Sequence, residues 1–201
     1  MKMYIMRHGE TTGDVEGRFG GAYDDALSED GVAQARGLAD ELRDRLREDG
    51  IERILASDLV RAQQTAAFLG SALGIDVDTE PRWRERDQYA GLSGMVKAEA
   101  RREHPELVEK LKDRLFTAPG AESYADFAAR IAAVFDDVVA AGKPAVLVGH
   151  GGCLRVVFRD ILRMGELTEI GDCCWVELIR EEAGWRVGGS RRIGFGFNQE
   201  V

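Results

Sequence analysis

Residues 3–10 read MYIMRHGE, and residues 144–152 read PAVLVGHGG. In both stretches a short apolar run is followed, one residue later, by a histidine, and a glycine comes directly after that histidine. Short continuous apolar runs are typical of strands that are buried on both faces of a parallel sheet. Ligands of open parallel sheets bind beyond the carboxyl ends of the strands. His8 and His150 are therefore predicted to lie where a ligand would bind.

The rest of the chain alternates between strand and helix patterns, which predicts a mainly parallel sheet. Ser28 and Asp58 are residue types that cap helix N-termini, and each precedes a helical pattern. Pro105 disfavours helix at His104, so the charged helix around them is expected to break there. The predicted strands are 3–6, 51–56, 75–79 and 144–149; the later helices are 96–115, 122–141 and 151–162; and the loops are 9–28 and 80–94.

The C-terminal segment has a different pattern. Residues 174–180 and 185–193 alternate apolar and polar side chains, and residues 181–184 suit a turn, which predicts an antiparallel hairpin. The expected fold class is α/β, with three layers, a mainly parallel sheet, helices on both faces and an antiparallel C-terminal addition. A chain of 201 residues suits one domain spanning residues 1–201.

Charge and cysteine content narrow the function classes. The chain has 36 acidic and 27 basic residues and a net charge of -9, so neither nucleic acid nor an anionic membrane is an expected partner. Three cysteines without CxxC spacing predict neither a disulfide framework nor a zinc site. The N-terminal apolar run is too short for a signal peptide, and no stretch suits a membrane span. We therefore expect a cytoplasmic protein.

Basic side chains follow the same strand ends as the two histidines. Arg7 precedes His8, and Arg61 follows the strand at 51–56 at the start of a helix. Glycine beside each histidine allows backbone to approach a ligand, and the helix beginning at Gly151 offers free N–H groups. Two guanidinium forks match phosphate oxygens. Such a set in an acidic protein predicts a pocket for a phosphate dianion.

Several of these segments carry a family resemblance. Arg7-His8-Gly9-Glu10-Thr11, residues 23–31 (YDDALSEDG), residues 57–66 (SDLVRAQQTA) and Gly149-His150-Gly151-Gly152 occur in the order and spacing of the histidine phosphatase superfamily, the phosphoglycerate mutase-like proteins. Residues 120–124 (GAESY) also resemble the segment that opens a helix in that family. The resemblance runs in register from residue 3 to about residue 163.

The resemblance implies a role for each position. His8 would be the nucleophile that accepts the phosphoryl group, Arg7 and Arg61 would bind phosphate, and His150 would stabilise the transferring group. Glu85 would be the general acid that protonates the leaving oxygen. A neutral imidazole suits the first role because its ordinary pKa is about 6.5. Phosphoryl transfer mainly requires positioning and charge stabilisation, which these side chains could supply without metal or cofactor.

Four features leave alternatives open. Asp14 stands where family members often have Asn, and a carboxylate there would repel a phosphate dianion unless it turns away or is protonated. The loop after Glu85 is one residue longer than usual, so Asp87 is the second candidate for the acid. Arg18 is a candidate substrate contact. The basic residues between 101 and 114 suit either a solvated face or a substrate clamp.

The leading functional hypothesis is a metal-independent phosphomonoesterase that hydrolyses a small phosphorylated metabolite through a phosphohistidine. The first alternative is a cofactor-dependent phosphoglycerate mutase, although residues 95–119 are short and mixed in charge for a mutase. The second is an inactive member that binds phosphorylated ligands. A metallohydrolase is disfavoured because the two histidines lack a spaced carboxylate cluster. The resemblance also admits a homodimer.

Overall fold

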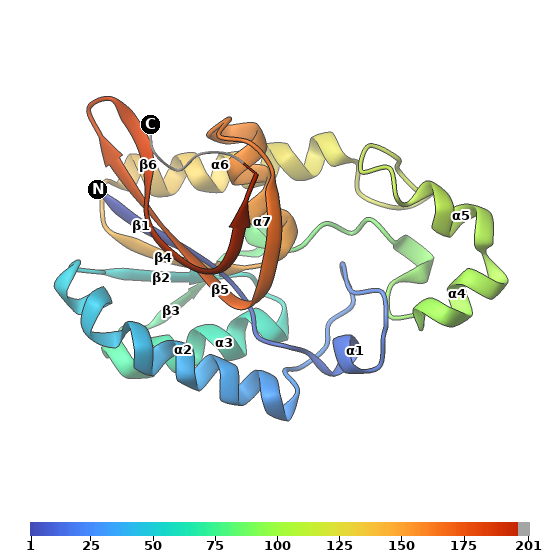
Figure 1. Ribbon diagram of the computed structural model, residues 1–201, viewed down its shortest axis with the longest axis horizontal. Helices are drawn as coiled ribbons and strands as arrows, with labels where there is room; N and C mark the ends of the chain where they lie inside the picture. The colour runs from blue at the N-terminus through green and yellow to red at the C-terminus, as the bar shows by residue number, and fades with distance from the viewer. Residues whose placement is uncertain (197–201) are drawn as a thin grey trace.

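A computed structural model describes residues 1–196 and contains a six-stranded sheet with the order β3-β2-β4-β1-β5-β6 (Figure 1). The first four strands in this order are parallel to one another, and β5 and β6 continue the sheet as antiparallel strands. This confirms the predicted mainly parallel sheet with an antiparallel C-terminal addition. The strands are β1 (Lys2–Arg7), β2 (Arg53–Ala56), β3 (Val77–Thr79), β4 (Ala145–Gly149), β5 (Leu167–Glu181) and β6 (Gly184–Phe195).

Helices cover both faces of the sheet because alternate side chains of the central strands point to opposite sides. Met3 and Ile5 of β1 pack with α6 and α7, whereas Tyr4 and Met6 pack with α2 and α3. Figure 1 shows α2 and α3 below the sheet and α6 and α7 above it. The α-helices are α1 (Thr12–Val15), α2 (Glu29–Glu48), α3 (Val60–Leu73), α4 (Lys97–Glu103), α5 (Pro105–Lys110), α6 (Tyr124–Ala141) and α7 (Gly151–Val156).

The register between β1 and β4 aligns the ends of the two strands. Arg7 pairs with Gly149, and the His8 N–H donates a hydrogen bond of 3.0 Å to the Gly149 carbonyl. Strand β2, which pairs with β4 on its other side, ends at the same level of the sheet. The Ser57 N–H, one residue after β2, donates to the Val148 carbonyl of β4. His8, Ser57 and His150 therefore leave three adjacent parallel strands at one edge of the sheet.

The cap of α3 differs from the prediction. The helix begins after Leu59, and its N-cap makes no side-chain hydrogen bond. The free N–H of Val60 is bound instead by the Asp24 carboxylate at 2.8 Å, and Asp58 forms an ion pair with Arg84 at 2.9 Å. The predicted cap at Asp58 is thus wrong because a carboxylate from a distant loop takes its place. The cap of α2 by Ser28 is confirmed, since its hydroxyl accepts from the Gly31 N–H at 2.9 Å.

The C-terminal strands are longer than the sequence pattern indicates. β5 begins at Leu167, and its first half is irregular, with a register shift between Ile170 and Trp175 and a φ of +51° at Cys173. Such a bulge interrupts the alternation from which a strand is recognised. The predicted helix over 151–162 is α7 followed by one π-helical segment, Val157–Ile161. The predicted loop over 80–94 contains two short 3-10 segments, Pro81–Trp83 and Ala90–Leu92.

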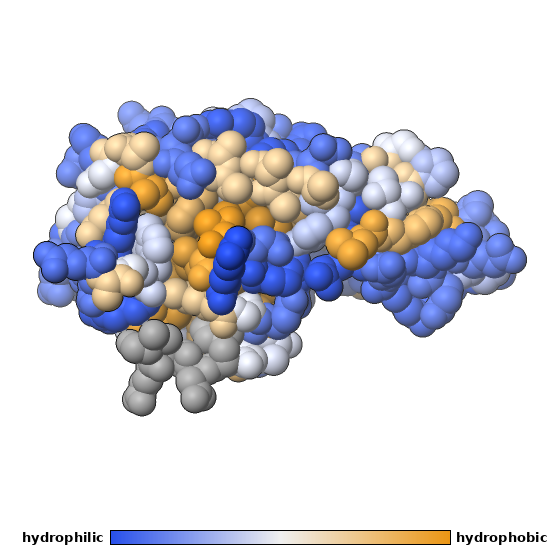
Figure 2. Space-filling model, turned by 90° about the horizontal axis from the view of Figure 1, so that it is seen from above, coloured by the Kyte–Doolittle hydropathy of each residue, from blue (hydrophilic) through white to orange (hydrophobic). Residues whose placement is uncertain are grey.

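Helices α4 and α5 form an arm that projects beyond the end of the sheet (Figure 1). The predicted break between them is confirmed, since α4 ends before His104 and α5 begins at Pro105. The arm has a small core of its own around Phe19, Leu92 and Ala100. Figure 2, in which the arm lies at the right, shows a strip of apolar atoms along it. None of the helices within residues 1–196 combines the length and apolar character needed to cross a bilayer.

The loop that carries His8 lies directly against α2. A Cβ at Gly31, in the first turn of α2, would overlap the Glu10 carbonyl, whereas a Cβ at Gly37 would meet no atom within 4 Å. We predict that Gly31→Ala lowers the free energy of unfolding by about 1–3 kcal/mol, because either the loop or the helix must shift. Activity should fall with it, because Glu10 lies two residues from His8.

Gly37→Ala is the matched control in the same helix. It should raise the free energy of unfolding by roughly 0.5–1 kcal/mol, because alanine is the better helix former. Urea denaturation of the two variants measures both effects. Equal behaviour of the two variants would contradict the tight contact between Gly31 and the Glu10 carbonyl.

Candidate active site

A cavity of about 450 Å³ opens at the carboxyl edge of the sheet. Six of the predicted site residues line its wall, whereas His150 and Asp87 do not. The six residues are Arg7, His8, Arg18, Arg61, Glu85 and Gly151. These residues come from segments far apart in the sequence. They lie together in one cavity, as expected at the carboxyl edge of a parallel sheet.

Two hydrogen bonds fix the tautomer of His8. Its Nδ1 lies 2.7 Å from the Gly9 carbonyl, and its Nε2 lies 3.2 Å from the Nε of Arg61. A carbonyl can only accept and a guanidinium N–H can only donate, so Nδ1 carries the proton and Nε2 carries the lone pair. Nε2 is therefore the nitrogen that could attack an electrophile, and the Arg61 side chain marks where the electrophile would bind.

His8 is also kept neutral. Its side chain is buried, with 6 % exposure, and burial lowers the pKa of His8 well below its ordinary value. The charges of Arg7 and Arg61 lower the pKa of His8 further, because a second cation nearby disfavours the imidazolium. A buried imidazole between two guanidinium groups keeps its lone pair at neutral and mildly acidic pH.

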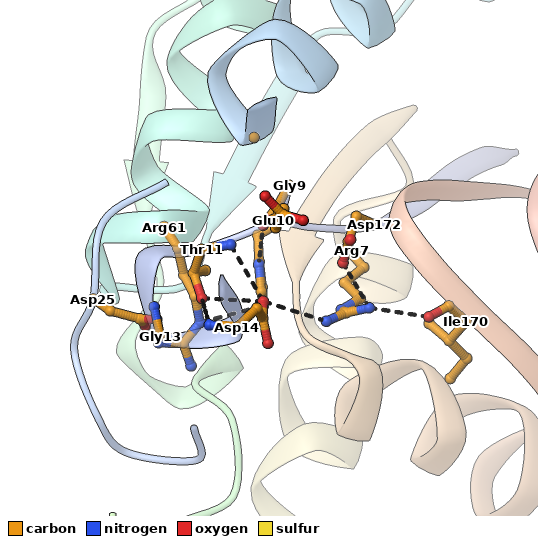
Figure 3. Close-up of polar contacts among 12 residues, drawn as sticks. Arg7, Gly9, Glu10, Thr11, Gly13, Asp14, Asp25, Arg61, Ile170 and Asp172 are labelled. Carbon is orange, nitrogen blue, oxygen red and sulfur yellow. Dashed lines mark hydrogen bonds and ion pairs between the residues drawn. The ribbon is translucent and has the colours of Figure 1, made fainter. Parts of the chain in front are cut away.

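Arg61 is fixed in place by its surroundings. Its Nη1 forms a buried ion pair with Asp25 at 2.8 Å and donates to the Tyr23 carbonyl, and its Nη2 donates to the Gly21 carbonyl at 2.9 Å. Figure 3 shows Asp25 beside the end of the Arg61 side chain. The loop at 20–25 thus holds the guanidinium in one orientation against His8, with 3 % of Arg61 exposed.

Arg7 is held from the opposite side of the cavity. Its Nη1 bonds Asp172 at 2.8 Å and the Ile170 carbonyl at 3.0 Å, both supplied by the irregular first half of β5. Its Nη2 lies 4.0 Å from the Oδ2 of Asp14 (Figure 3). Because Nη1 is already bonded, Nη2 is the nitrogen of Arg7 that is left to bind an anion in the cavity.

Asp14 faces the cavity rather than turning away from it. Its Oδ2 accepts hydrogen bonds from the backbone N–H and the hydroxyl of Thr11, at 3.2 and 3.0 Å, and so closes a capping box on α1. Figure 3 places this carboxylate between Thr11 and Arg7. The residue type that departs from the family pattern thus has a structural role in the turn after the His8 loop.

His150 lies behind the cavity wall. It is fully buried, its Nε2 is 2.8 Å from the Ser57 hydroxyl oxygen, and its ring centroid is 5.2 Å from that of His8. Burial, followed by the charge of Arg61, lowers the pKa of His150 well below its ordinary value. Its Nδ1 is buried without a hydrogen-bond partner among residues 1–196. The His150 imidazole is thus neutral, and it lies next to His8 with one ring nitrogen unpaired.

The structure separates the two candidates for the general acid. Both oxygens of Glu85 accept backbone N–H bonds, from Arg86 at 2.8 Å and from Gly152 at 2.9 Å, and the side chain lines the cavity. Asp87 lies outside the lining, where its Oδ1 accepts from the Ala90 N–H at 3.2 Å. The geometry therefore favours Glu85 over Asp87.

Several residues of the site were not found from the sequence. Asp25, Ser57 and Asp172 position the predicted residues, and only the first two lie in segments that the motifs cover. Of the charged residues at 101–114, only Arg114 lines the cavity. The other lining side chains that were missed include Arg86, Lys97, Tyr124, Arg155 and Arg159. Within residues 1–196 no three His, Cys, Asp or Glu side chains gather where they could hold a metal ion.

A neutral, buried histidine with its lone pair beside two guanidinium forks, at the edge of an α/β sheet, has the chemistry that suits a phosphoryl group. The comparison with known families gives the same result: the chain belongs to the histidine phosphatase superfamily, whose branch 1 model matches residues 3–191. The resemblance found in the sequence is thereby confirmed.

Individual relatives carry two kinds of name. A protein of Enterobacter sp. (strain 638) described as probable phosphoglycerate mutase GpmB is 31% identical, over 94% of this chain and 89% of its own. The mycobacterial glucosyl-3-phosphoglycerate phosphatase solved with VO3 is 28% identical, with a TM-score of 0.78 over 94% of this chain and 97% of its own. The alpha-ribazole phosphatase from Shigella flexneri, at 19% identity and a TM-score of 0.79 over 100% of both chains, shares the fold.

The lowered pKa values of His8 and His150 predict a pH-dependent stability. Below about pH 6.5 the unfolded chain binds protons at both histidines while the folded chain does not. The free energy of unfolding should therefore fall as the pH falls, by up to about 1.4 kcal/mol per pH unit for each histidine. Denaturant titrations between pH 7 and 5.5 measure the slope. His8→Asn should remove about half of it, and an unchanged slope would contradict a buried neutral His8.

Proposed function

We propose that the chain is a phosphomonoesterase that hydrolyses a small phosphorylated metabolite through a phosphohistidine at His8. The observation that carries the proposal is the Nε2 lone pair of His8, which is fixed by the Gly9 carbonyl and lies next to the Arg61 guanidinium. A phosphoryl group bound by Arg61 would present its phosphorus to this nitrogen. Membership of the histidine phosphatase superfamily supports the same role.

The first step forms one bond and breaks another. The Nε2 lone pair forms a P–N bond while the bond between phosphorus and the substrate oxygen breaks, and Glu85 gives its proton to that oxygen. Arg7 and Arg61 would balance the charge on the phosphoryl oxygens, which is the largest demand of phosphoryl transfer. His150, whose ring centroid lies 5.2 Å from that of His8, would stabilise the transferring group from beside the nucleophile.

The second step returns the enzyme to its starting state. Water attacks the phosphorus, the P–N bond breaks, and Glu85, now a carboxylate, takes the proton from the water. Splitting one displacement into two in this way is the general advantage of covalent catalysis. Apart from the attacking water, each group that these two steps use is a side chain of this protein.

Hydrolysis is preferred to the mutase alternative because most of the 101–114 segment faces away from the cavity. Arg102 is paired with Glu103 at 2.9 Å and Lys112 with Glu109 at 2.6 Å, which suits a solvated face. The named mycobacterial phosphatase also matches nearly the whole chain. The name of the GpmB relative keeps the mutase as the second candidate.

Phosphoenzyme trapping tests the proposal directly. After an acid-free quench, wild-type protein incubated with a labelled phosphomonoester should carry label that is stable to base and released by acid, as expected for phosphohistidine. His8→Ala should carry none and should lose at least about a thousandfold in kcat, since it lacks the acceptor. His104→Ala is the control, because that side chain is exposed on the arm. Release of free phosphate without added bisphosphoglycerate distinguishes a phosphatase from a mutase.

Replacement of the acid should separate substrates by their leaving groups. Glu85→Gln removes the proton that an alkyl oxygen needs on departure, whereas nitrophenolate departs readily without one. We expect kcat on an alkyl phosphate to fall by about 10²–10⁴, and kcat on nitrophenyl phosphate to fall far less. Asp87→Asn, in the same loop but outside the cavity wall, should show no such dependence. If Asp87→Asn shows it instead, the assignment of the acid to Glu85 is wrong.

A further inference from the structure

The buried imidazole of His150 has one bonded ring nitrogen and one unpaired ring nitrogen. Its Nε2 lies 2.8 Å from the Ser57 hydroxyl oxygen, and its Nδ1 has no hydrogen-bond partner within residues 1–196. Because the ring is neutral, one nitrogen carries a hydrogen and the other carries a lone pair. The position of that hydrogen determines whether Nδ1 can donate to a phosphoryl oxygen.

The Ser57 hydroxyl has two hydrogen-bond neighbours in the part of the chain that the structure describes. Its oxygen accepts a hydrogen bond of 3.3 Å from the Leu59 N–H, and it lies beside Nε2 of His150. Ser57 is fully buried. A hydroxyl has a single hydrogen to donate, and an N–H group cannot accept it. The lone pair of Nε2 is therefore the acceptor that this hydrogen can reach.

Two arrangements of hydrogen fit the 2.8 Å distance between Ser57 and His150. In the first, the hydroxyl donates to Nε2 and the ring hydrogen is on Nδ1, so one buried group, the Nδ1–H, is unpaired. In the second, Nε2–H donates to the hydroxyl oxygen, and two buried groups are unpaired within residues 1–196: the hydroxyl hydrogen and the Nδ1 lone pair. Each unpaired buried group costs free energy, so the first arrangement is favoured.

The backbone holds the Ser57 hydroxyl in this place. Ser57 directly follows β2, which pairs with β4, and His150 directly follows β4. The Ser57 N–H donates to the Val148 carbonyl at 3.0 Å, and the Ser57 carbonyl accepts from the Gln63 side-chain amide at 2.6 Å. Both backbone groups of Ser57 are thus bonded to neighbouring elements, and the hydroxyl stays against Nε2.

The indole of Trp83 is the other buried N–H that could bind Nδ1. It packs against the residue before His150, since a Cβ at Gly149 would lie 2.4 Å from the indole nitrogen. This nitrogen forms no hydrogen bond within residues 1–196, so it does not donate to Nδ1. No described donor therefore stabilises a lone pair on Nδ1, which again favours Nδ1–H.

We propose that Ser57 is a positioning residue that holds the ring hydrogen of His150 on Nδ1, from where it donates to an oxygen of the transferring phosphoryl group. The location of the hydrogen follows from the contacts alone, whereas its use in transfer rests on the proposed function. Ser57 acts through His150 and does not itself contact the substrate. Without the hydroxyl, nothing at Nε2 selects one form, and the hydrogen would be divided between the two nitrogens.

Nuclear magnetic resonance of protein labelled with 15N in its histidine rings tests where the hydrogen lies, because the two nitrogens of a neutral imidazole differ in chemical shift according to which is protonated. The chain has three histidines, and loss of one signal in His150→Gln assigns His150. We expect Nδ1–H at His150 in the wild-type protein and a mixture of both forms in Ser57→Ala. Ser57→Thr, which retains the hydroxyl, should keep Nδ1–H.

Ser71→Ala is the matched control, since it is the same substitution at an exposed position of α3 outside the cavity wall. It should leave the His150 signals unchanged. Nε2–H at His150 in the wild-type protein would overturn the proposal, and this result needs no variant to fold. Unchanged Nδ1–H in a folded Ser57→Ala protein would show that another group selects the form, and would also overturn it.

A double-mutant cycle tests whether Ser57 acts through His150. With nitrophenyl phosphate, Ser57→Ala should lower kcat by about tenfold and change KM less, because the donor acts mainly in the transition state. In the His150→Gln background, Ser57→Ala should change kcat by less than about twofold. An equal loss in both backgrounds would mean that Ser57 does not act through His150. Ser71→Ala should leave kcat unchanged.

Failure of this inference can be told apart from failure of the proposed function. If the wild-type protein hydrolyses nitrophenyl phosphate but its spectra show Nε2–H at His150, the role of Ser57 is wrong and the phosphatase proposal stands. If no phosphomonoester is hydrolysed, the proposed function fails, and the spectra still decide whether Ser57 holds the hydrogen on Nδ1.

Discussion

A neutral imidazole held among guanidinium groups is the constraint on which the rest of the site depends. Cations beside His8 disfavour its protonation, and the Gly9 carbonyl determines which nitrogen keeps the lone pair. The same cations would attract the phosphoryl group. The two arginines would therefore both keep His8 neutral and bind the phosphoryl group. This requires that their side chains stay fixed beside His8. Asp25, in the cavity wall, and Asp172, outside it, meet that requirement by forming ion pairs with Arg61 and Arg7.

The framework that brings these groups together could be predicted from the sequence. Residues 3–6 and 145–148 are apolar at every position rather than at alternate positions. Such continuous runs are typical of central strands in a parallel sheet, which are buried on both faces. Their ends then place His8 and His150 at one edge, and the four motifs identify the family. The ion pair between Asp25 and Arg61 follows from none of these patterns, because it depends on how the loop at 20–25 folds over α3.

The errors have physical causes of the same kind. Asp58 has the right residue type for a cap but lies one residue before the N-cap Leu59, and Asp24 reaches the first free N–H of α3 from a loop more than thirty residues away. The first half of β5 was missed because its bulge breaks the alternation, and Asp172 lies in that half. The resemblance puts Glu85 first and Asp87 second as the candidate acid, and the path of the loop turns Glu85, but not Asp87, into the cavity wall. Arg155 was missed because a lone arginine in a helix is ordinary in sequence.

The place of β1 in the sheet has a consequence for how the chain acquires its site during synthesis. Both neighbours of β1, β4 and β5, come from the last third of the chain, so the first strand made waits for partners that emerge more than 140 residues later. Contacts of such long sequence separation form slowly, because the loop between them must first be closed. Residues 3–6 are apolar and would be exposed meanwhile, so a growing chain is expected to depend on shielding of this segment until β4 and β5 emerge.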